Sequence, residues 1–325
     1  MDLLAYEMKY WEKGLVNVVG IDEAGRGPLA GPVVAACVVL YKHSPIEGVN
    51  DSKKLSPKKR DKLFDLIIEN ALDVSVGIAN EDDIDKLNIL QATFLAMKRA
   101  VGNLKILPDQ LLVDGPYSNI KMYPVETIIK GDSKSASVAS ASIIAKVTRD
   151  RIMEEYDKVY PQYNFKKHKG YGTKFHIDQL LNYKATPIHR KSFKIVKRNL
   201  PTFKFYEKNK GLYDLGRKLV ATYFIKKNYK MLDKDILLQN IAKSVDYLYA
   251  NKNEMSYIKV LVEYNNILYP LTVKGKINIE SYIENIRDLV NEKEVTKKTS
   301  FNVILVKFIN NKKPLIKVLN NENIF

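Results

Sequence analysis

The feature that most constrains the fold is an apolar run that ends in two adjacent acids. Residues 18–33 read VVGIDEAGRGPLAGPV, and the apolar segment VAACVVL follows directly. Apolar runs of this length, separated by glycine and proline, predict two buried β-strands joined by a corner. Asp22 and Glu23 begin this corner, and their like charges repel each other unless a cation neutralises them. One acid would be an ordinary strand exit, whereas the adjacent pair indicates a metal site.

Helices and strands alternate along the rest of the first 200 residues. Apolar periodicity predicts helices at residues 1–13, 56–71, 81–104 and 136–160. Short apolar runs predict strands at VSVGIA, DQLLVDGP and VETII. Because a strand hairpin comes first and the later strands alternate with helices, the pattern predicts an α/β fold in which helices flank a mixed sheet.

Two further acids lie at the ends of apolar segments. Asp114 ends LLVDG, and Asp132 follows a strand in KGDSK. With no histidine or cysteine close to them in the sequence, these oxygen ligands favour Mg²⁺ or Mn²⁺ over zinc. A pair of such ions activates a water and stabilises the leaving oxygen when a phosphodiester is displaced. The four acids therefore indicate a nuclease.

The glycines of the corner have a separate role in this interpretation. Gly25 and Gly27 flank Arg26, and a glycine backbone allows a ligand to approach its N–H and C=O groups closely. A ribose 2′-hydroxyl both donates and accepts hydrogen bonds, and it distinguishes RNA from DNA. We therefore expect the corner to contact a 2′-hydroxyl.

Charge and composition restrict the class of protein. The chain carries 53 Lys and Arg against 37 Asp and Glu, a net charge of +16, which suits a partner rich in phosphate. The sequence lacks the uninterrupted apolar run of about 18 residues that a membrane span needs. Its first residues mix acids with apolar positions, unlike a secretory or transit signal. We expect a cytoplasmic protein that binds nucleic acid and no membrane.

Several motifs together resemble one known family. GIDEAGRGPLAGPVVAA, NDSKKLSPKKR, VDG, GDSKS, ASIIAKVTRDR, HKGYGT and PIHRKSF resemble, in order and spacing, the motifs of bacterial ribonuclease HII over residues 1–199. The resemblance implies a ribonuclease-H-like fold and metal-dependent hydrolysis of the RNA strand in RNA–DNA hybrids. It also implies cleavage 5′ of single ribonucleotides in duplex DNA, leaving 5′-phosphate and 3′-hydroxyl ends.

The resemblance assigns roles to individual residues. The family's catalytic, metal-binding carboxylates fall on Asp22, Glu23, Asp114 and Asp132. Its ribonucleotide-sensing residues fall on Gly25, Arg26, Gly27 and Tyr171, and its phosphate contact falls on Lys53. In that family the tyrosine stacks against the deoxyribose beside the junction.

Other charged residues and the histidines of these motifs have more than one possible role. We expect Lys146 and Arg149 either to follow the nucleic-acid backbone or to complete a basic helix stripe, and Asp150 to pair with Arg149 or Arg151. His168 and His189 each lack a second histidine at ligand spacing in the sequence, so they are interpreted as structural or close to phosphate.

The domain organisation is expected to be a catalytic domain at 1–200, a linker at 201–209 and a small α/β domain at 210–325. The last domain resembles, more weakly, the restriction-endonuclease-like YraN family. Its acids would be Asp246 and Glu263, but the lysine expected at position 265 is replaced by Asn265. We therefore expect a degenerate module that binds nucleic acid or a protein partner, or a plain appended domain.

Two alternatives to the ribonuclease remain open from the sequence. One is a hybrid-binding protein without activity, and the other is a metal-dependent DNA nuclease of the same fold. The complete set of four acids counts against the first. Gly25, Arg26, Gly27 and Tyr171 count against the second.

Overall fold

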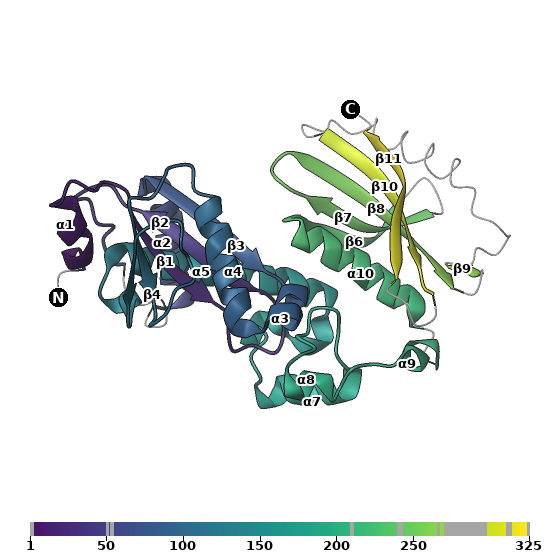
Figure 1. Ribbon diagram of the computed structural model, residues 1–325. Helices are drawn as coiled ribbons and strands as arrows, with labels where there is room; N and C mark the ends of the chain where they lie inside the picture. Colours follow the sequence, from purple (N-terminus) through teal and green to yellow (C-terminus); the bar gives the residue numbers. More distant parts are fainter. Residues whose placement is uncertain are drawn as a thin grey trace. The chain divides into compact units, whose positions relative to one another are not determined.

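The computed structural model describes residues 3–49, 52, 55–208, 211–238, 243–264, 267–269, 298–309 and 314–323. The chain divides into two compact units (Figure 1). The first comprises Met1–Glu154 and Gln162–Leu200, and the second comprises Glu155–Pro161 and Pro201–Phe325. No helix in the described ranges is both long enough and apolar enough to cross a membrane.

The first unit contains a five-stranded sheet flanked by helices. Its strands are β1 (Val18–Ala24), β2 (Val33–Val39), β3 (Asp73–Ala79), β4 (Gln110–Asp114) and β5 (Val125–Ile128). Its longer helices are α1 (Ala5–Trp11), α2 (Pro57–Asn70), α3 (Glu81–Leu87), α4 (Ile89–Gly102), α5 (Ala136–Val159) and α7 (Lys174–Tyr183). The short elements are η1 (Gly131–Ser133), α6 (Phe165–His168), α8 (Lys194–Lys197) and, counted with both units, η2 (Pro161–Tyr163).

The strand order is β3-β2-β1-β4-β5, and the sheet is mixed as expected. The β1–β2 and β2–β3 pairs are antiparallel, whereas β1, β4 and β5 run parallel. Since parallel strands end at the same edge of a sheet, the carboxyl ends of β1, β4 and β5 lie together. This edge is where the acids Asp22 and Asp114 are found.

The sheet is buried on both faces, which explains the unbroken apolar sequence of β2. Ala35 and Cys37 of β2 join one core with α4, while Ala36 and Val38 join another with α2 and α5. Because neighbouring side chains of a strand point to opposite faces, a strand covered on both sides has no polar positions to alternate with.

Close packing fixes α5 against β1. A side chain at Gly20 would place its Cβ only 2.1 Å from the backbone carbon of Ser137, so no larger residue fits there. Glu7 of α1 is fully buried and accepts hydrogen bonds from the backbone and hydroxyl of Ser137 and from the hydroxyl of Ser135. These contacts hold the beginning of α5 beneath the strand that carries Asp22.

One expected element differs from the structure. Residues 81–104 were predicted as a single helix, but the chain forms α3 and α4 with a break at Asn88, whose φ is +70°. The Asn88 side chain accepts hydrogen bonds from the N–H groups of Leu90 and Gln91 and so caps a new helix. Apolar periodicity continues across such a break, so periodicity alone did not reveal it.

The second unit contains a sheet and a helix. They are α10 (Leu212–Lys226), β6 (Lys230–Leu238), β7 (Lys243–Ala250), β8 (Glu254–Tyr264), β9 (Ile267–Tyr269), β10 (Lys298–Lys307) and β11 (Leu315–Asn323). The main order is β11-β10-β8-β7-β6, with β9 paired to β8. Residues 201–209, expected as a linker, include the short helix α9 (Phe203–Lys208). The helix expected near 278–290 and most of the strand expected at 269–274 lie outside the described residues.

Strands β6 and β11 were not predicted from the sequence. Both lie at the two ends of the strand order, where only one side of the strand pairs with another described strand. Their exposed positions include Leu232, Leu315 and Val318 mixed with charged residues, so neither sequence shows a buried apolar pattern. The strands predicted in this unit are the inner ones, β7, β8 and β10.

Candidate active site

Strand pairing brings Asp22 and Asp114 to neighbouring positions. β1 and β4 are parallel with Ile21 opposite Val113, and the two acids follow at the next residue of each strand. Asp22 is 4% exposed, and its Oδ1 accepts the N–H of Glu23 at 2.7 Å. The sheet therefore positions both acids, which lie far apart in the sequence.

A tight turn after β5 places Asp132 beside this edge. The Oδ1 atom of Asp114 accepts the N–H of Gly131 at 2.6 Å, directly before Asp132. Asp132 itself is 7% exposed within η1. The turn begins at Lys130, which has a φ of +58°. This hydrogen bond therefore connects Asp114 to the backbone segment that carries Asp132.

The site concentrates negative charge. Burial raises the pKa of Asp22 well above its usual value, and the neighbouring charges of Glu23 and Asp114 raise it further. A hydrogen bond from Ser142 acts in the opposite direction. A cation placed among these carboxylates would stabilise their ionised forms, because opposite charges attract strongly in a poorly hydrated site.

Two serines support Asp22, and the sequence did not point to either. Ser142 lies on α5, and its hydroxyl also forms a 2.9 Å hydrogen bond with the hydroxyl of Ser52. Both serines are buried. Ser52 belongs to the NDSKK motif, whose Lys53 lies outside the described residues. Ser52 is therefore connected to the carboxylate of Asp22 through the hydroxyl of Ser142.

In the structure, the described acids do not form a complete metal-binding site. Among the residues described, no group of three or more His, Cys, Asp or Glu side chains is placed so that it could hold a metal ion. Asp22 and Asp114 each engage a backbone N–H, and Glu23 pairs with Arg26 at 3.3 Å. The donor set nevertheless suits a hard divalent cation, because all its ligand atoms are carboxylate oxygens.

Two buried arginines hold the corner that contains Gly25, Arg26 and Gly27. Arg190 donates to the carbonyl groups of Gly25, Arg26, Gly31 and Pro32. Arg149 donates to the carbonyls of Ala30, Pro32 and Lys169. Gly25 has a φ of +99°, and a Cβ there would lie 2.0 Å from Arg149 Nε. The arginines thus fix the backbone shape of the corner.

Tyr171 lies beside the corner. Its ring is 3.7 Å from the position that a Cβ on Gly27 would take, and the Arg149 guanidinium lies 6.0 Å from the ring centroid. The residue is 45% exposed, so one side of the ring is accessible. The structure therefore brings together Tyr171 and the glycines that the sequence indicated.

His168 and His189 lie next to a third histidine, His176, and contact other protein groups, in line with the interpretation of both as structural. His176 stacks on His168 with ring centroids 4.6 Å apart, and its Nε2 lies 3.1 Å from Nε2 of His189. His176 Nδ1 donates to the carbonyl of Tyr171. Burial lowers the pKa of His176 to about 4 and that of His189 well below its usual value. These neutral rings support the backbone of Tyr171.

The expectations for other basic residues are corrected. Arg149 is 1% exposed and binds carbonyl groups of the protein, so it does not follow a nucleic-acid backbone. Asp150 pairs with Lys146 at 2.7 Å, and Arg151 pairs with Asp61. The reason is helical spacing, because residues four apart lie on the same helix face while neighbours in sequence do not.

The acids of the second unit are engaged by bases. Asp246 lies 2.9 Å from Arg217 Nε and 3.4 Å from Lys259 Nζ, and it accepts the hydroxyl of Tyr213. Glu263 pairs with Lys307 at 2.6 Å. The β7–β8 register, in which Tyr247 faces Ile258, therefore brings Lys259 to Asp246.

Comparison with known proteins gives consistent results for the first unit. A family model described as Ribonuclease HII matches residues 19–196. Ribonuclease HII of Clostridioides difficile (strain 630) is 59% identical over 191 residues, covering 58% of this chain and 74% of that protein. Ribonuclease HII of Endomicrobium trichonymphae is 55% identical over 196 residues, covering 59% and 92%.

Solved structures include the ribonuclease H2 from Pyrococcus horikoshii OT3, which is 31% identical with a TM-score of 0.49. That similarity covers 56% of this chain and 96% of the other. The family match ends at residue 196, before Pro201 begins the main part of the second unit.

Proposed function

The chain belongs to the ribonuclease HII family, and from this premise we propose how its residues act on the substrate. As a ribonuclease H of type 2, the enzyme cleaves the RNA strand of RNA–DNA hybrids and depends on a divalent metal ion. We assign the metal-binding and catalytic roles to Asp22, Glu23, Asp114 and Asp132, with Mg²⁺ or Mn²⁺ as the ion.

The observation that carries this assignment is the parallel pairing of β1 and β4. In this pairing Asp22 and Asp114 lie side by side at one sheet edge, where burial, and then the charges of Glu23 and Asp114, raise the pKa of Asp22. When bound, a pair of metal ions would supply an activated water and charge stabilisation for the leaving oxygen. Ser142 orients Asp22, and the Gly131 N–H orients Asp114.

Recognition of the ribonucleotide is assigned to the corner and the tyrosine. Gly25, Arg26 and Gly27 would present backbone groups to the 2′-hydroxyl, in the shape that Arg190 and Arg149 impose. Tyr171 would stack on the neighbouring deoxyribose. In this arrangement the cut falls 5′ of a single ribonucleotide embedded in duplex DNA.

The second unit is proposed not to cut. Asp246 and Glu263 each have a cationic partner from their own unit, and Asn265 stands where a catalytic lysine would be required. A role in binding nucleic acid or a protein partner is compatible with this arrangement.

Substitution of Asp114 by Asn tests the assigned site. We expect the cleavage rate of a duplex with one ribonucleotide to fall by about two to four orders of magnitude, because metal-bound charge stabilisation is worth several kcal/mol. Binding to the same duplex should change little. Asp65→Asn, on the exposed face of α2, is the matched control and should keep the wild-type rate.

Product mapping in the same assay separates the alternatives. Equal cutting of the all-DNA duplex and the ribonucleotide-containing duplex would identify a DNA nuclease. Binding without cleavage by the wild-type protein, with Mg²⁺ or Mn²⁺ supplied, would identify an inactive hybrid-binding protein. Either result contradicts the proposed function.

Substitution of Tyr171 by Ala tests recognition of the junction. Loss of the ring should reduce cleavage at single embedded ribonucleotides more than cleavage of long hybrids, because a long hybrid offers many alternative positions. Tyr171→Phe keeps the stacking plane and should behave like the wild type. Equal losses on both substrates in Tyr171→Ala would remove the proposed role. The measurement is kcat/KM on the two substrates in parallel.

A further inference from the structure

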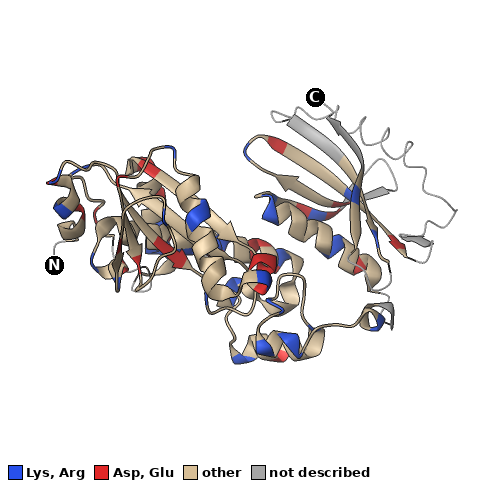
Figure 2. Ribbon diagram, viewed as in Figure 1, with Lys and Arg blue, Asp and Glu red and all other residues tan. Residues whose placement is uncertain are grey.

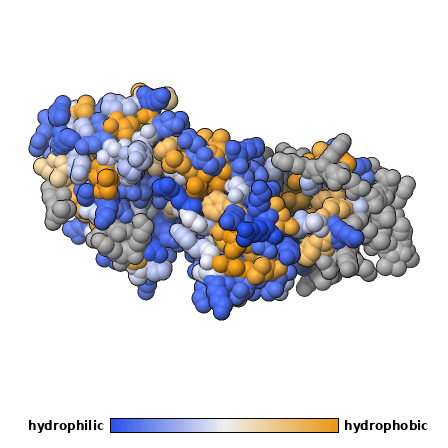
Figure 3. Space-filling view, turned by 60° about the horizontal axis from the view of Figure 1, so that its bottom comes forward, coloured by the Kyte–Doolittle hydropathy of each residue, from blue (hydrophilic) through white to orange (hydrophobic). Residues whose placement is uncertain are grey.

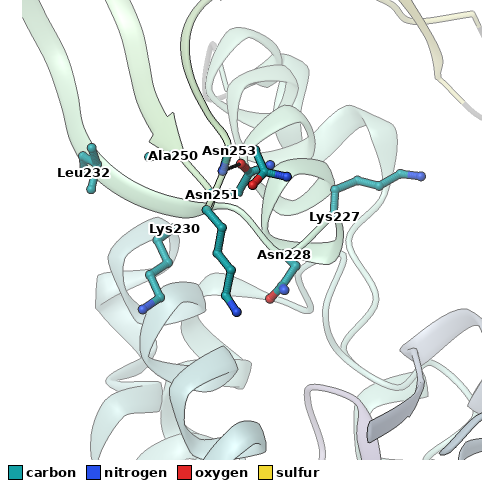
Figure 4. A pocket seen from close by; sticks show the side chains of 8 residues that line it. Lys227, Asn228, Lys230, Leu232, Ala250, Asn251 and Asn253 are labelled. Carbon is teal, nitrogen blue, oxygen red and sulfur yellow. Dashed lines mark hydrogen bonds between the residues drawn. The ribbon is translucent and has the colours of Figure 1, made fainter. Parts of the chain in front are cut away.

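The second unit contains a pocket of about 550 Å³ that the ribonuclease reaction does not use. It lies where α10 passes into β6 and where the hairpin joins β7 to β8. In Figure 4, Lys227 and Lys230 lie on opposite sides of the pocket, with Asn228 and Asn251 between them. Lysine and asparagine side chains line it together with Leu232 and Ala250, so its polar groups are ammonium and amide groups.

The pocket carries positive charge without a matching acid. Lys227, Lys230 and Lys252 line it, and no Asp or Glu does. Within the described part of the chain, none of the three forms an ion pair, whereas Lys218 and Lys307 of the same unit each pair with an acid. The Nζ atom of Lys227 lies over the Tyr223 ring, 5.9 Å from its centroid. Figure 2 shows Lys and Arg positions along α10, up to the end that leads into β6.

The backbone around the lysines is well defined. Asn251 Oδ1 accepts the N–H groups of Asn253 and Glu254 at 2.8 and 2.9 Å, which fixes the β7–β8 hairpin next to Lys252. Asn228, with a φ of +66°, ends α10 and directs the chain into β6. The lysines therefore lie around one space beside two turns, at Asn228 and at Asn251.

We propose that this pocket binds the phosphate backbone of duplex nucleic acid. Three ammonium groups that pair with no acid among the described residues, together with amide donors from Asn228 and Asn253, suit successive phosphates, whereas a single small anion would leave most of the charge unmatched. Nucleic acid is favoured over an acidic protein because the chain's proposed substrate is itself a duplex. The inference rests on the proposed function to that extent. Residues 201–325, with 22 Lys and Arg against 13 Asp and Glu, are also basic overall.

Binding measurements on matched double variants test the proposal in the full chain. Lys230→Gln with Lys252→Gln removes two pocket charges, and Lys204→Gln with Lys317→Gln removes two exposed charges elsewhere in the same unit. The probe is a labelled all-DNA duplex, titrated at several salt concentrations with EDTA present. Each lost phosphate contact should lower the slope of log Kd against log salt by about 0.9.

The pocket variant should therefore show a slope lower by about one to two, with weaker binding, while the control variant keeps the wild-type slope. The proposal is overturned if the slope of log Kd against log salt is the same in the pocket variant and in the control variant. A protein partner would then be the occupant to test next. Circular dichroism of both variants checks that these exposed substitutions leave the fold intact.

Cleavage of a duplex with one ribonucleotide keeps this proposal separate from the proposed function. The pocket variant should have a higher KM, with kcat and the position of the cut unchanged. If the wild type does not cut, the proposed function fails, but the EDTA binding result still decides the pocket. If the wild type cuts and the pocket variant has an unchanged KM and salt slope, only the pocket proposal fails.

Discussion

Individual residues of the site divide into those that the sequence identified and those that only the fold revealed. Asp22 and Asp114 could be singled out because Asp22 is followed directly by a second acid and both follow apolar segments that form strands. Arg190 was not, because nothing in its local sequence indicates that it binds carbonyls more than 150 residues earlier. Ser142 was hidden among the small residues of α5 for the same reason. Charged residues of a site can be identified from the sequence, whereas the residues that support them from distant positions in the chain cannot.

Arg190→Lys tests whether the arginine positions the corner. Lysine keeps the charge but loses the planar fork that binds several carbonyls at once, so the corner should lose its fixed shape. We expect kcat/KM for an embedded ribonucleotide to fall about tenfold or more, since each hydrogen bond to a charged group contributes about 1.5–3 kcal/mol. Arg198→Lys, at an exposed position nearby in sequence, is the control. Unchanged cleavage in Arg190→Lys would mean that the corner keeps its shape without this residue.

At the level of elements, the sequence predicted the order of strands and helices well but not their breaks and edges. β1, β2, α2, β3, β4 and α5 of the first unit follow the predicted pattern, and the mixed sheet is confirmed. The division at Asn88 depends on a single left-handed residue, and β6 and β11 are edge strands with exposed positions. Such features depend on local backbone geometry or on partial burial, neither of which changes apolar periodicity.

The contact between β1 and α5 leads to a prediction for Gly20. In Gly20→Ala, the new Cβ would meet the backbone of Ser137 at 2.1 Å, so the helix or the strand must move. We expect the free energy of unfolding to fall by about 1–3 kcal/mol, the usual cost of overpacking, with reduced cleavage because Asp22 moves with its strand. Gly102→Ala is the control, since a Cβ there meets nothing within 4 Å. Urea denaturation of both variants measures the difference, and equal stabilities would contradict the packing argument.

For the whole molecule, the sequence identified the catalytic part and left the remainder undefined. The family match ends at residue 196, whereas the strands of the second unit, β6 to β11, form a separate sheet. Surface character is similarly mixed: on the face seen in Figure 3, hydrophobic groups lie among hydrophilic ones. We therefore expect the second unit to act through its charged residues. The composition of the chain does not show which part of the surface carries them.

Removal of residues 201–325 gives a prediction at this scale. Within the second unit, Glu155, Lys158 and Tyr160 form hydrogen bonds with Met231 and Thr222, which the truncation removes. Truncation after Leu200 should therefore lower the melting temperature while leaving cleavage of an embedded ribonucleotide in place. The matched comparison is the full chain assayed at low salt. A truncated protein that is folded by circular dichroism but inactive would show that the second unit takes part in catalysis.

The anchoring of the corner by Arg190 has a consequence for biosynthesis. Synthesis proceeds from the amino end, so all four carboxylates have left the ribosome before this arginine has been added. During that interval the corner that contains Gly25, Arg26 and Gly27 lacks the hydrogen bonds that Arg190 donates to it. A nascent chain thus carries all four acids before the corner that we propose to recognise the ribonucleotide receives its support from the last part of the first unit.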